Sequence, residues 1–373
     1  MKLDYIKYCR SGLMAVALAG ASICVPNVAS AQTEGAEGTV SFGISHSSRY
    51  GTRGDIDLSI SNILNSGIDT RVRYSNGANG QAYSAQLGIV RELGDSFLGS
   101  DTRLSFGVSG QFTDWTVDNY KAQTLAATLG VSTQLAENIR GYTTLAWRRA
   151  DISNLAAGVS PILLKDLGQA ESLHAELGLV YDTRENESFL SPGILGSLRA
   201  GIGLSGDASL RQSWGKVSVQ SVTQLNDLIY LRVVADAGSV FADDTQHVHV
   251  LDRSFTAAGL PRGFSYGGAG PRDTSVDMAL GGTKYASASG EVLFNVPIRG
   301  LSIGLFYDMG TVWDVPAAAG ATILEDNFLR SSYGISLNYE FGSAILRMSY
   351  AEANKSLPSD DTNVLSIALS AKF

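Results

Sequence analysis

The chain ends with the stretch Leu365-Ser366-Ile367-Ala368-Leu369-Ser370-Ala371-Lys372-Phe373, in which apolar and polar side chains alternate. Successive side chains of a β-strand point to opposite faces of its sheet. One face would carry Leu365, Ile367, Leu369, Ala371 and Phe373, and the other would carry Ser366, Ser370 and Lys372. The pattern therefore predicts a strand whose apolar face ends on the aromatic ring of Phe373.

The same alternation recurs from Thr39 onward, in segments of about ten residues that are separated by Gly, Asn, Asp and Ser. In one segment, for example, Leu104, Phe106 and Val108 alternate with polar or small residues. The expected strands begin near Val40, Ile56, Arg71, Tyr83, Arg103, Gln123, Arg140, His174, Ser197, Lys216, Ile229, Ala286, Ser302, Tyr333, Ala344 and Val364. The predicted fold class is all-β and antiparallel, with about sixteen strands.

The first residues carry the pattern of a secretory signal. Lys2, Lys7 and Arg10 precede an apolar stretch over residues 12–25, and Ala29-Ser30-Ala31 offers a cleavage site. We expect a signal peptide over residues 1–31 and a barrel domain over residues 39–373.

Charge and cysteine content restrict the partners of the mature chain. Both cysteines, Cys9 and Cys24, lie inside the predicted signal, so we expect no thiol, disulfide or thiolate metal site after cleavage. The whole chain has a formal net charge of −8, and the signal is its basic end. Such an acidic chain lacks the basic surface that nucleic acid requires, so nucleic acid is not an expected partner.

Export and strand length favour a membrane location over a soluble β-sandwich, in which strands would alternate in the same way. After the signal, no stretch approaches the ~18 consecutive apolar residues of a membrane-spanning helix. The expected strands do match a tilted transmembrane span of roughly 9–11 residues. Unpaired backbone groups are too costly in hydrocarbon to leave an open sheet edge, so we expect a closed transmembrane β-barrel in the bacterial outer membrane, surrounded by its lipid.

The connections between strands are expected to alternate in length. The short ones, such as residues 225–228, belong on the periplasmic side, and the long ones, residues 151–173 and 238–285, belong outside the cell. Within the first long connection, residues 161–170 are expected to form a short helix. Its Ile162, Leu163, Leu164 and Leu167 would pack on the barrel rim.

The longest connection contains Leu260-Pro261-Arg262-Gly263-Phe264, and the following segments contain Glu291 and the run Phe306-Tyr307-Asp308-Met309-Gly310. An earlier segment reads Tyr181-Asp182-Thr183-Arg184-Glu185-Asn186. Together these motifs closely resemble the BamA-type superfamily of outer-membrane insertases and transporters, also described as bacterial surface antigen barrels. The motif-level resemblance covers about residues 177–373.

The resemblance implies a sixteen-stranded barrel whose long loop folds back into the lumen. The loop motif Arg262, Gly263 and Phe264 would then place its arginine against the inner-wall partners Glu291 and Asp308. Strand parity agrees, because Asp308 opposes the apolar positions beside it. The terminal Phe373 resembles the address that outer-membrane assembly machinery reads. The alternative for the arginine contact is a simple loop anchor without a direct part in activity.

Two features depart from the family pattern. Only seven residues separate Ala31 from Thr39, too few for the periplasmic POTRA domains that insertases carry before the barrel. The last strand also lacks an internal glycine that would ease opening of the seam.

Catalytic chemistry is not expected from the sequence. The four histidines are His46, His174, His247 and His249, and none of them lies in a recognisable Ser/His constellation or beside a Gly-x-Ser-x-Gly turn that stands out as a nucleophile elbow. His247 and His249 would share a strand face, but two ligands on a loop make a poor metal site. We therefore expect no enzyme activity, no cofactor and no metal.

Two function classes remain for such a barrel. The first is a protein insertase or translocase, which assists outer-membrane protein assembly or export and takes unfolded outer-membrane proteins or a separate periplasmic subunit as partners. The second is a passive pore or surface antigen that retains the scaffold. The arginine and carboxylate motifs favour the first class, and the missing periplasmic domains favour the second. The substrate and the oligomeric state do not follow from the sequence.

Overall fold

The computed structural model describes residues 37–47, 51–63, 66–77, 80–94, 101–115, 120–155, 158–186, 188–241, 247–257, 259–315, 319–324 and 327–372. The predicted signal peptide and Phe373 lie outside these described residues. In the part of the chain that the structure describes, no helix is long and apolar enough to cross a membrane.

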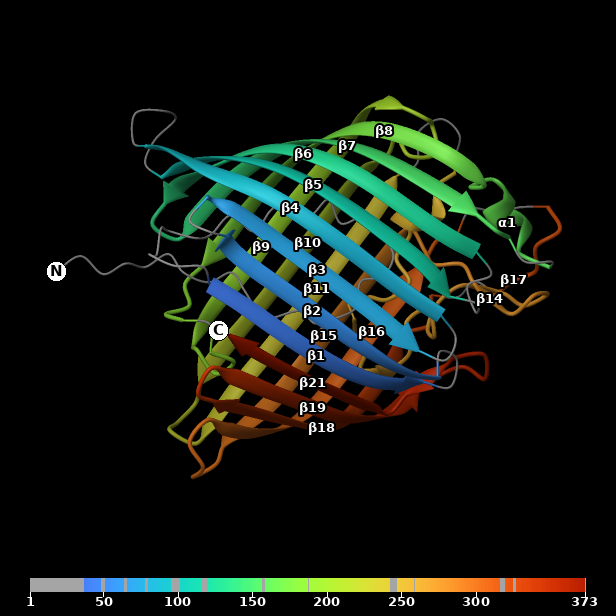
Figure 1. Cartoon of the computed structure of the whole chain (residues 1–373). Coiled ribbons are helices and arrows are strands. Elements are labelled where there is room, and N and C mark those ends of the chain that lie inside the picture. Colours follow the sequence, from blue (N-terminus) through green and yellow to red (C-terminus); the bar gives the residue numbers. More distant parts are fainter. Residues whose placement is uncertain are drawn as a thin grey trace.

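The described residues form a closed antiparallel barrel, as the alternation predicts (Figure 1). Its sixteen strands are β1 (Glu37–Ser47), β2 (Gly51–Ile63), β3 (Ile68–Gly77), β4 (Gly80–Gly94), β5 (Thr102–Trp115), β6 (Tyr120–Ala136), β7 (Ile139–Ser153), β8 (Gly168–Asp182), β9 (Gly193–Gly206), β10 (Ser213–Gln224), β11 (Ile229–Phe241), β15 (Lys284–Asn295), β16 (Leu301–Trp313), β18 (Arg330–Phe341), β19 (Ala344–Lys355) and β21 (Leu365–Lys372). Each strand pairs with its neighbour along the chain, and β1 pairs with β21 to close the barrel.

Side-chain alternation separates an apolar outer face from a polar lumen. On β5, Phe106 and Val108 are exposed on the outside, whereas Arg103 and Ser105 are buried inside. Exposed apolar side chains recur around the wall, and hydroxyl side chains such as Thr128 recur on the buried face. This arrangement is the reverse of a soluble protein and is typical of a barrel that faces lipid.

The connections make the two mouths different. β1 begins and β21 ends at the same mouth, which also carries tight turns such as the one that joins β10 to β11. There Asn226 Oδ1 accepts hydrogen bonds from the backbone N–H of Leu228 and Ile229, at 2.9 and 3.0 Å. We call this end the short-turn mouth and the opposite end the long-loop mouth. The longest connection, residues 242–283, leaves from the long-loop mouth.

Short elements of the loops assemble at the long-loop mouth (Figure 1). β13 (Arg272–Asp273) pairs with both β14 (Met278–Ala279) and β17 (Ile323–Leu324), and β12 (Gly263–Phe264) pairs with β20 (Thr362–Asn363). A hydrophobic cluster joins wall side chains to these loops; it contains Ala122, Ala150, Ile152, Leu163, Leu210, Val250, Leu251, Phe255 and Met278. The long loop is therefore packed against the inner wall.

The helix in the first long connection is shorter than predicted. It spans only α1 (Pro161–Leu164), with Ser160 as its N-cap, and β8 begins soon afterwards at Gly168. Ile162 and Leu163 are buried as expected, but Leu164 and Leu167 are exposed. The prediction that these last two pack on the rim is wrong, because the chain leaves the helix at Asp166, whose side chain turns inward to the long loop.

Candidate functional site

The long loop delivers Arg262 to the inner wall. β12, which directly follows Arg262, pairs with β20 and so fixes this part of the loop. Gly263, the first residue of β12, has a φ of +92°, which strongly favours glycine. Gly310 on β16 allows the close approach, since a Cβ atom there would lie only 3.0 Å from the ring of Pro261. The sequence thus places small residues where loop and wall meet.

Arg262 makes a forked contact with Asp308 on β16. Its Nε lies 2.7 Å from Oδ2, its Nη2 lies 2.9 Å from Oδ1, and its backbone N–H donates to Oδ2 at 3.0 Å. The face of its guanidinium rests on Phe306, with Cζ 3.4 Å from the ring centroid. Two parallel hydrogen bonds and a stacked ring fix the orientation of the arginine.

Glu291 on β15 is the second carboxylate of the site. Its Oε1 lies 3.5 Å from Nη1 of Arg262 and accepts a hydrogen bond from the Ser336 hydroxyl, and its Oε2 lies 3.5 Å from Nη1 of Arg232. Glu291 and Asp308 are both buried and face the lumen, on the faces that strand parity predicts. Burial alone would lower the pKa of Arg262, but the hydrogen bonds and charge of Asp308 and Glu291 raise it above its ordinary value.

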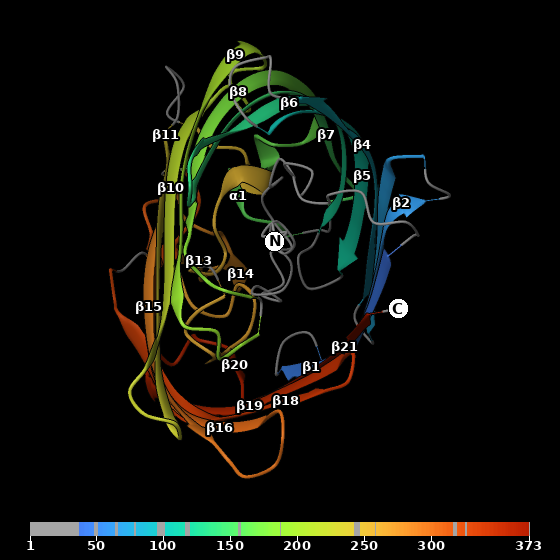
Figure 2. The same ribbon diagram turned by 90° about the vertical axis from the view of Figure 1, so that its left-hand side faces the viewer.

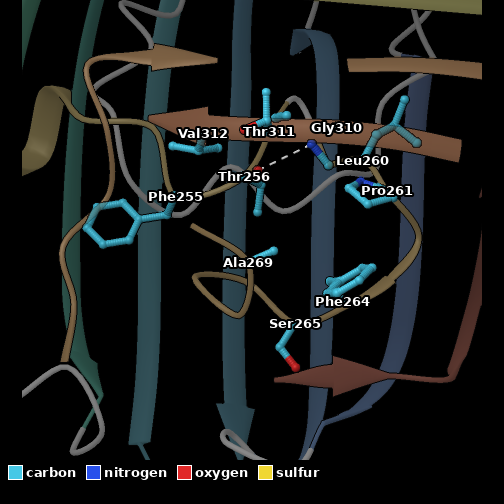
Figure 3. Close-up of a pocket in the computed structure, with 12 residues that line it drawn as sticks. Phe255, Thr256, Leu260, Pro261, Phe264, Ser265, Ala269, Gly310, Thr311 and Val312 are labelled. Atoms are coloured by element: carbon cyan, nitrogen blue, oxygen red, sulfur yellow. Dashed lines mark hydrogen bonds between the residues drawn. The ribbon is translucent and has the colours of Figure 1, made fainter. Parts of the chain in front are cut away.

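Phe264 lies beside a small cavity between the loop and the wall (Figure 3). Leu260, Pro261 and Phe264 line one side, and Gly310, Thr311 and Val312 of β16 line the other. The loop above it is braced by a hydrogen bond from the Gly259 N–H to Thr256 Oγ1, 3.2 Å. The space is small and mostly apolar, so it fits loose packing under the motif better than a ligand.

Two further arginine contacts tie the long loop and the β19–β21 connection to the wall, and the sequence did not reveal them. Arg148 on β7 donates to both oxygens of Asp252, and Arg330 on β18 donates to both oxygens of Asp360 in the connection before β20. Arg148 occupies an inward-facing position in the two-residue period of its strand, and this position could have indicated a contact in the lumen. The burial of Asp252 and Asp360 could not be predicted in this way, because irregular segments have no periodicity.

The histidines do not assemble a metal site in the described residues. No group of three or more His, Cys, Asp or Glu side chains there could hold a metal ion. His247 and His249 lie in irregular loop, not on a strand face as we predicted, because His247 bonds to Asp166 at 2.7 Å and His249 caps the short helical turn η2 (Val250–Asp252).

Sequence inspection missed one serine and histidine pair on β8. Ser172 Oγ lies 2.6 Å from His174 Nε2 in the lumen. Both residues are buried, and His174 Nδ1 has no hydrogen-bond partner in the described residues. A nucleophile needs access and an oriented base. This pair therefore fits a packing role.

The seam between β1 and β21 closes the barrel with the shortest strand. Within the described residues, β21 has 8 residues, whereas the other barrel strands have 10 to 17. The register runs from Thr39 opposite Lys372 to His46 opposite Leu365. Inside the lumen, the Ser41 hydroxyl donates to that of Ser370 across the seam at 2.8 Å.

Comparisons with known proteins agree with this architecture. A model of the Omp85 superfamily domain matches residues 62–373. The outer membrane protein assembly factor BamA of Neorickettsia risticii is 31% identical over 156 residues, which are 40% of this chain and 20% of that relative. The chain therefore spans about a fifth of the length of this curated relative.

Solved structures with the same fold include BamA from Haemophilus ducreyi lacking POTRA domains 1-3, with a TM-score of 0.69 and 17% identity over 90% of this chain and 70% of that one. CdiB from Acinetobacter baumannii has a TM-score of 0.59 and 14% identity, over 91% of this chain and 60% of that one. Identities this low show similarity of fold alone.

Proposed function

Because the chain belongs to the Omp85 superfamily of bacterial outer-membrane β-barrels, we propose that it helps other proteins enter the outer membrane. Its substrates would be unfolded outer-membrane proteins, delivered in the periplasm directly or by a separate periplasmic subunit. The relative named above as an assembly factor supports this class of activity.

The observation that carries the proposal is the seam. An insertase has to offer a free strand edge to which a substrate strand can pair. The edges of a closed barrel are exposed by separating two neighbouring strands, and the fewest ladder hydrogen bonds are lost where a strand is shortest. Among the described residues that strand is β21, which pairs over eight positions with β1 and over seven with β19. β19 and β21 are joined by the short connection that carries β20, whereas β1 and β21 stand at opposite ends of the barrel sequence, so of these two ladders the one with β1 can part into two free edges.

The anchoring of loop segments to the inner wall supports an insertase over a passive pore. Arg262, Arg148 and Arg330 hold loop residues against the inner wall through buried carboxylates. A barrel that only conducts solutes has no need for three such anchors, whereas a barrel that parts at its seam gains from an internal brace. The proposal includes no catalytic chemistry, cofactor or metal.

The test is reconstitution of the mature chain in lipid vesicles, followed by addition of a different, urea-unfolded outer-membrane β-barrel. We expect the substrate to become protease-resistant and heat-modifiable several times faster than in empty vesicles. Ion conductance is measured on the same preparation. Conductance without any acceleration of substrate folding would instead establish the pore.

A further inference from the structure

The connection between β8 and β9 reaches across the short-turn mouth. We call residues 183–186 and 188–192 the mouth turn. It is compact, because the Asn186 N–H donates to Ser191 Oγ at 3.2 Å and the Ser188 N–H donates to Asn186 Oδ1 at 2.9 Å. Gly193 ends it with a φ of +134°. Figure 2 views the barrel end-on from the side of this mouth.

The tip of the mouth turn is attached to strands well away from its own. Glu340 on β18 accepts hydrogen bonds from the Ser188 hydroxyl at 3.1 Å and from the Phe189 N–H at 2.9 Å. The Phe189 ring lies under two guanidinium groups, with Cζ of Arg232 on β11 at 5.0 Å and Cζ of Arg347 on β19 at 5.2 Å from its centroid. Distances below about 6 Å place both arginines in cation–π contact.

The two arginines have hydrogen-bonding capacity that Phe189 does not use. The Nε atoms of Arg232 and Arg347 are both buried and have no hydrogen-bond partner in the described residues. Buried donors without partners are uncommon in folded proteins, because each loses its hydrogen bond to water and gains none in return. The phenyl ring satisfies the faces of the guanidinium groups but offers no acceptor to their edges.

A ligand that kept the ring and added an anion would satisfy both the faces and the edges. The smallest such group on a polypeptide is an aromatic residue with a free carboxylate, which is a C-terminal aromatic residue. A carboxylate accepts charge-assisted hydrogen bonds from arginine, and these are about twice as strong as neutral ones.

We propose that Arg232 and Arg347 form a binding site for the C-terminal aromatic residue of an incoming polypeptide, which Phe189 occupies while no polypeptide is bound. The inference deepens the proposed function, because it names the part of a substrate that the barrel binds first. Glu340, which holds the mouth turn by its backbone, is the contact that releases when Phe189 leaves.

Occupation of this site is linked to the long loop through one side chain. Glu291 lies 3.5 Å from Arg232 through Oε2 and 3.5 Å from Arg262 through Oε1. A carboxylate that draws Arg232 toward itself competes with Glu291 for that arginine, and Glu291 is then free to pair more closely with Arg262. The ligand at the short-turn mouth therefore tightens the anchor of the long loop.

The test measures peptide binding and does not depend on insertion activity. The probe is a fluorescent ten-residue peptide with the sequence of residues 364–373, offered to the full mature chain folded in detergent micelles. We expect binding of the free acid, and at least about tenfold weaker binding of the C-terminal amide and of the peptide ending in alanine, since each lacks one contact worth about 1.4 kcal/mol or more. Equal binding of acid and amide would overturn the proposal.

Variants test whether Phe189 is the competitor. Phe189→Ala empties the site, so we expect it to bind the acid peptide several times more tightly, and Arg347→Gln to bind it about tenfold more weakly. The matched controls are Phe341→Ala and Arg299→Gln, which alter exposed side chains at the same mouth and should leave binding unchanged. Unchanged affinity in Phe189→Ala, with heat-modifiable migration confirming its fold, would refute the competition.

Discussion

Arg148 on the barrel wall and Asp252 in the long loop form two hydrogen bonds of 2.6 Å each, across 104 residues of sequence. The side chains are 3% and 16% exposed, so the pair is largely shielded from water. Burial alone would raise the pKa of Asp252, but the charge and hydrogen bonds of Arg148 hold it below its ordinary value. The loop is thus fixed at a second point, apart from Arg262.

We predict that Asp252→Asn loosens the long loop. Removing one partner of a shielded ion pair leaves the other uncompensated, which typically costs about 3–5 kcal/mol. The loop should become protease-sensitive in the folded barrel, and the thermal unfolding midpoint should fall. Asp277→Asn is the matched control, because its carboxylate also pairs with an arginine but is 83% exposed. Equal effects of the two substitutions would contradict the role assigned to burial.

Acidification should release the loop through His249. Burial lowers the pKa of His249 to about 4, from 6.5 for the free side chain. The unfolded segment therefore binds a proton between these values and the folded one does not. The stabilisation is complete above pH 6.5 and is lost as the pH falls toward 4, by up to about 3 kcal/mol.

The measurement is the rate of loop proteolysis in the folded barrel at pH 7.5 and at pH 5. His249→Asn should remove this part of the pH dependence, because asparagine can cap η2 as His249 does but does not titrate. A pH profile that is the same in the variant and the natural chain would assign the effect to other groups.

The Arg262 contact should behave as one shared unit. Arg262→Ala removes the cation that pairs with the buried carboxylates of Asp308 and Glu291. Asp308→Asn removes the carboxylate with which the arginine makes its forked contact. We expect each to destabilise the barrel by about 3–5 kcal/mol and the double variant to lose clearly less than the sum. Urea unfolding in lipid gives the three values. Additive losses would show that the residues act independently.

The strands were predictable because a period of two assigns every side chain to a face. The inward positions of Glu291 and Asp308 followed from counting along β15 and β16, and the expected strand starts lie close to the observed ones. The largest error is β8, which begins at Gly168 and not near His174. Its first outward positions, Gln169 and Glu171, are polar, so this part of the strand lacks the apolar alternation by which strands were recognised.

Most tertiary contacts of the loops could not be predicted from the sequence. Asp252 and Asp360 look like ordinary loop carboxylates, and their burial depends on where distant strands place Arg148 and Arg330. Phe189 follows a motif that was recognised in the sequence, but its position under two arginines depends on barrel closure. Arg262 was identified because its motif resembles a family pattern, not because its spacing defined a contact.

The final prediction concerns the seam, where Ser41 and Ser370 face each other with their hydroxyl oxygens 2.8 Å apart. Cysteines at both positions would place their sulfur atoms within reach of the ~2.05 Å disulfide bond after small adjustments. The mature chain should carry no competing thiol, since Cys9 and Cys24 lie in the predicted signal. Oxidation of Ser41→Cys/Ser370→Cys should abolish substrate insertion, and reduction should restore it, while conductance and heat-modifiable migration stay unchanged.

The matched control is Thr102→Cys/Thr133→Cys, because these hydroxyl oxygens lie 3.0 Å apart between β5 and β6, away from the seam. A disulfide there constrains two strands that need not separate, so insertion should continue at the original rate. If the oxidised seam variant also inserts substrate at full rate, β1 and β21 do not part during the reaction, and substrate strands have to enter by another route. Loss of insertion in both oxidised variants would instead indicate that the whole barrel has to deform. The two disulfides lie between different strand pairs, and the effect that they share is to make the barrel wall more rigid.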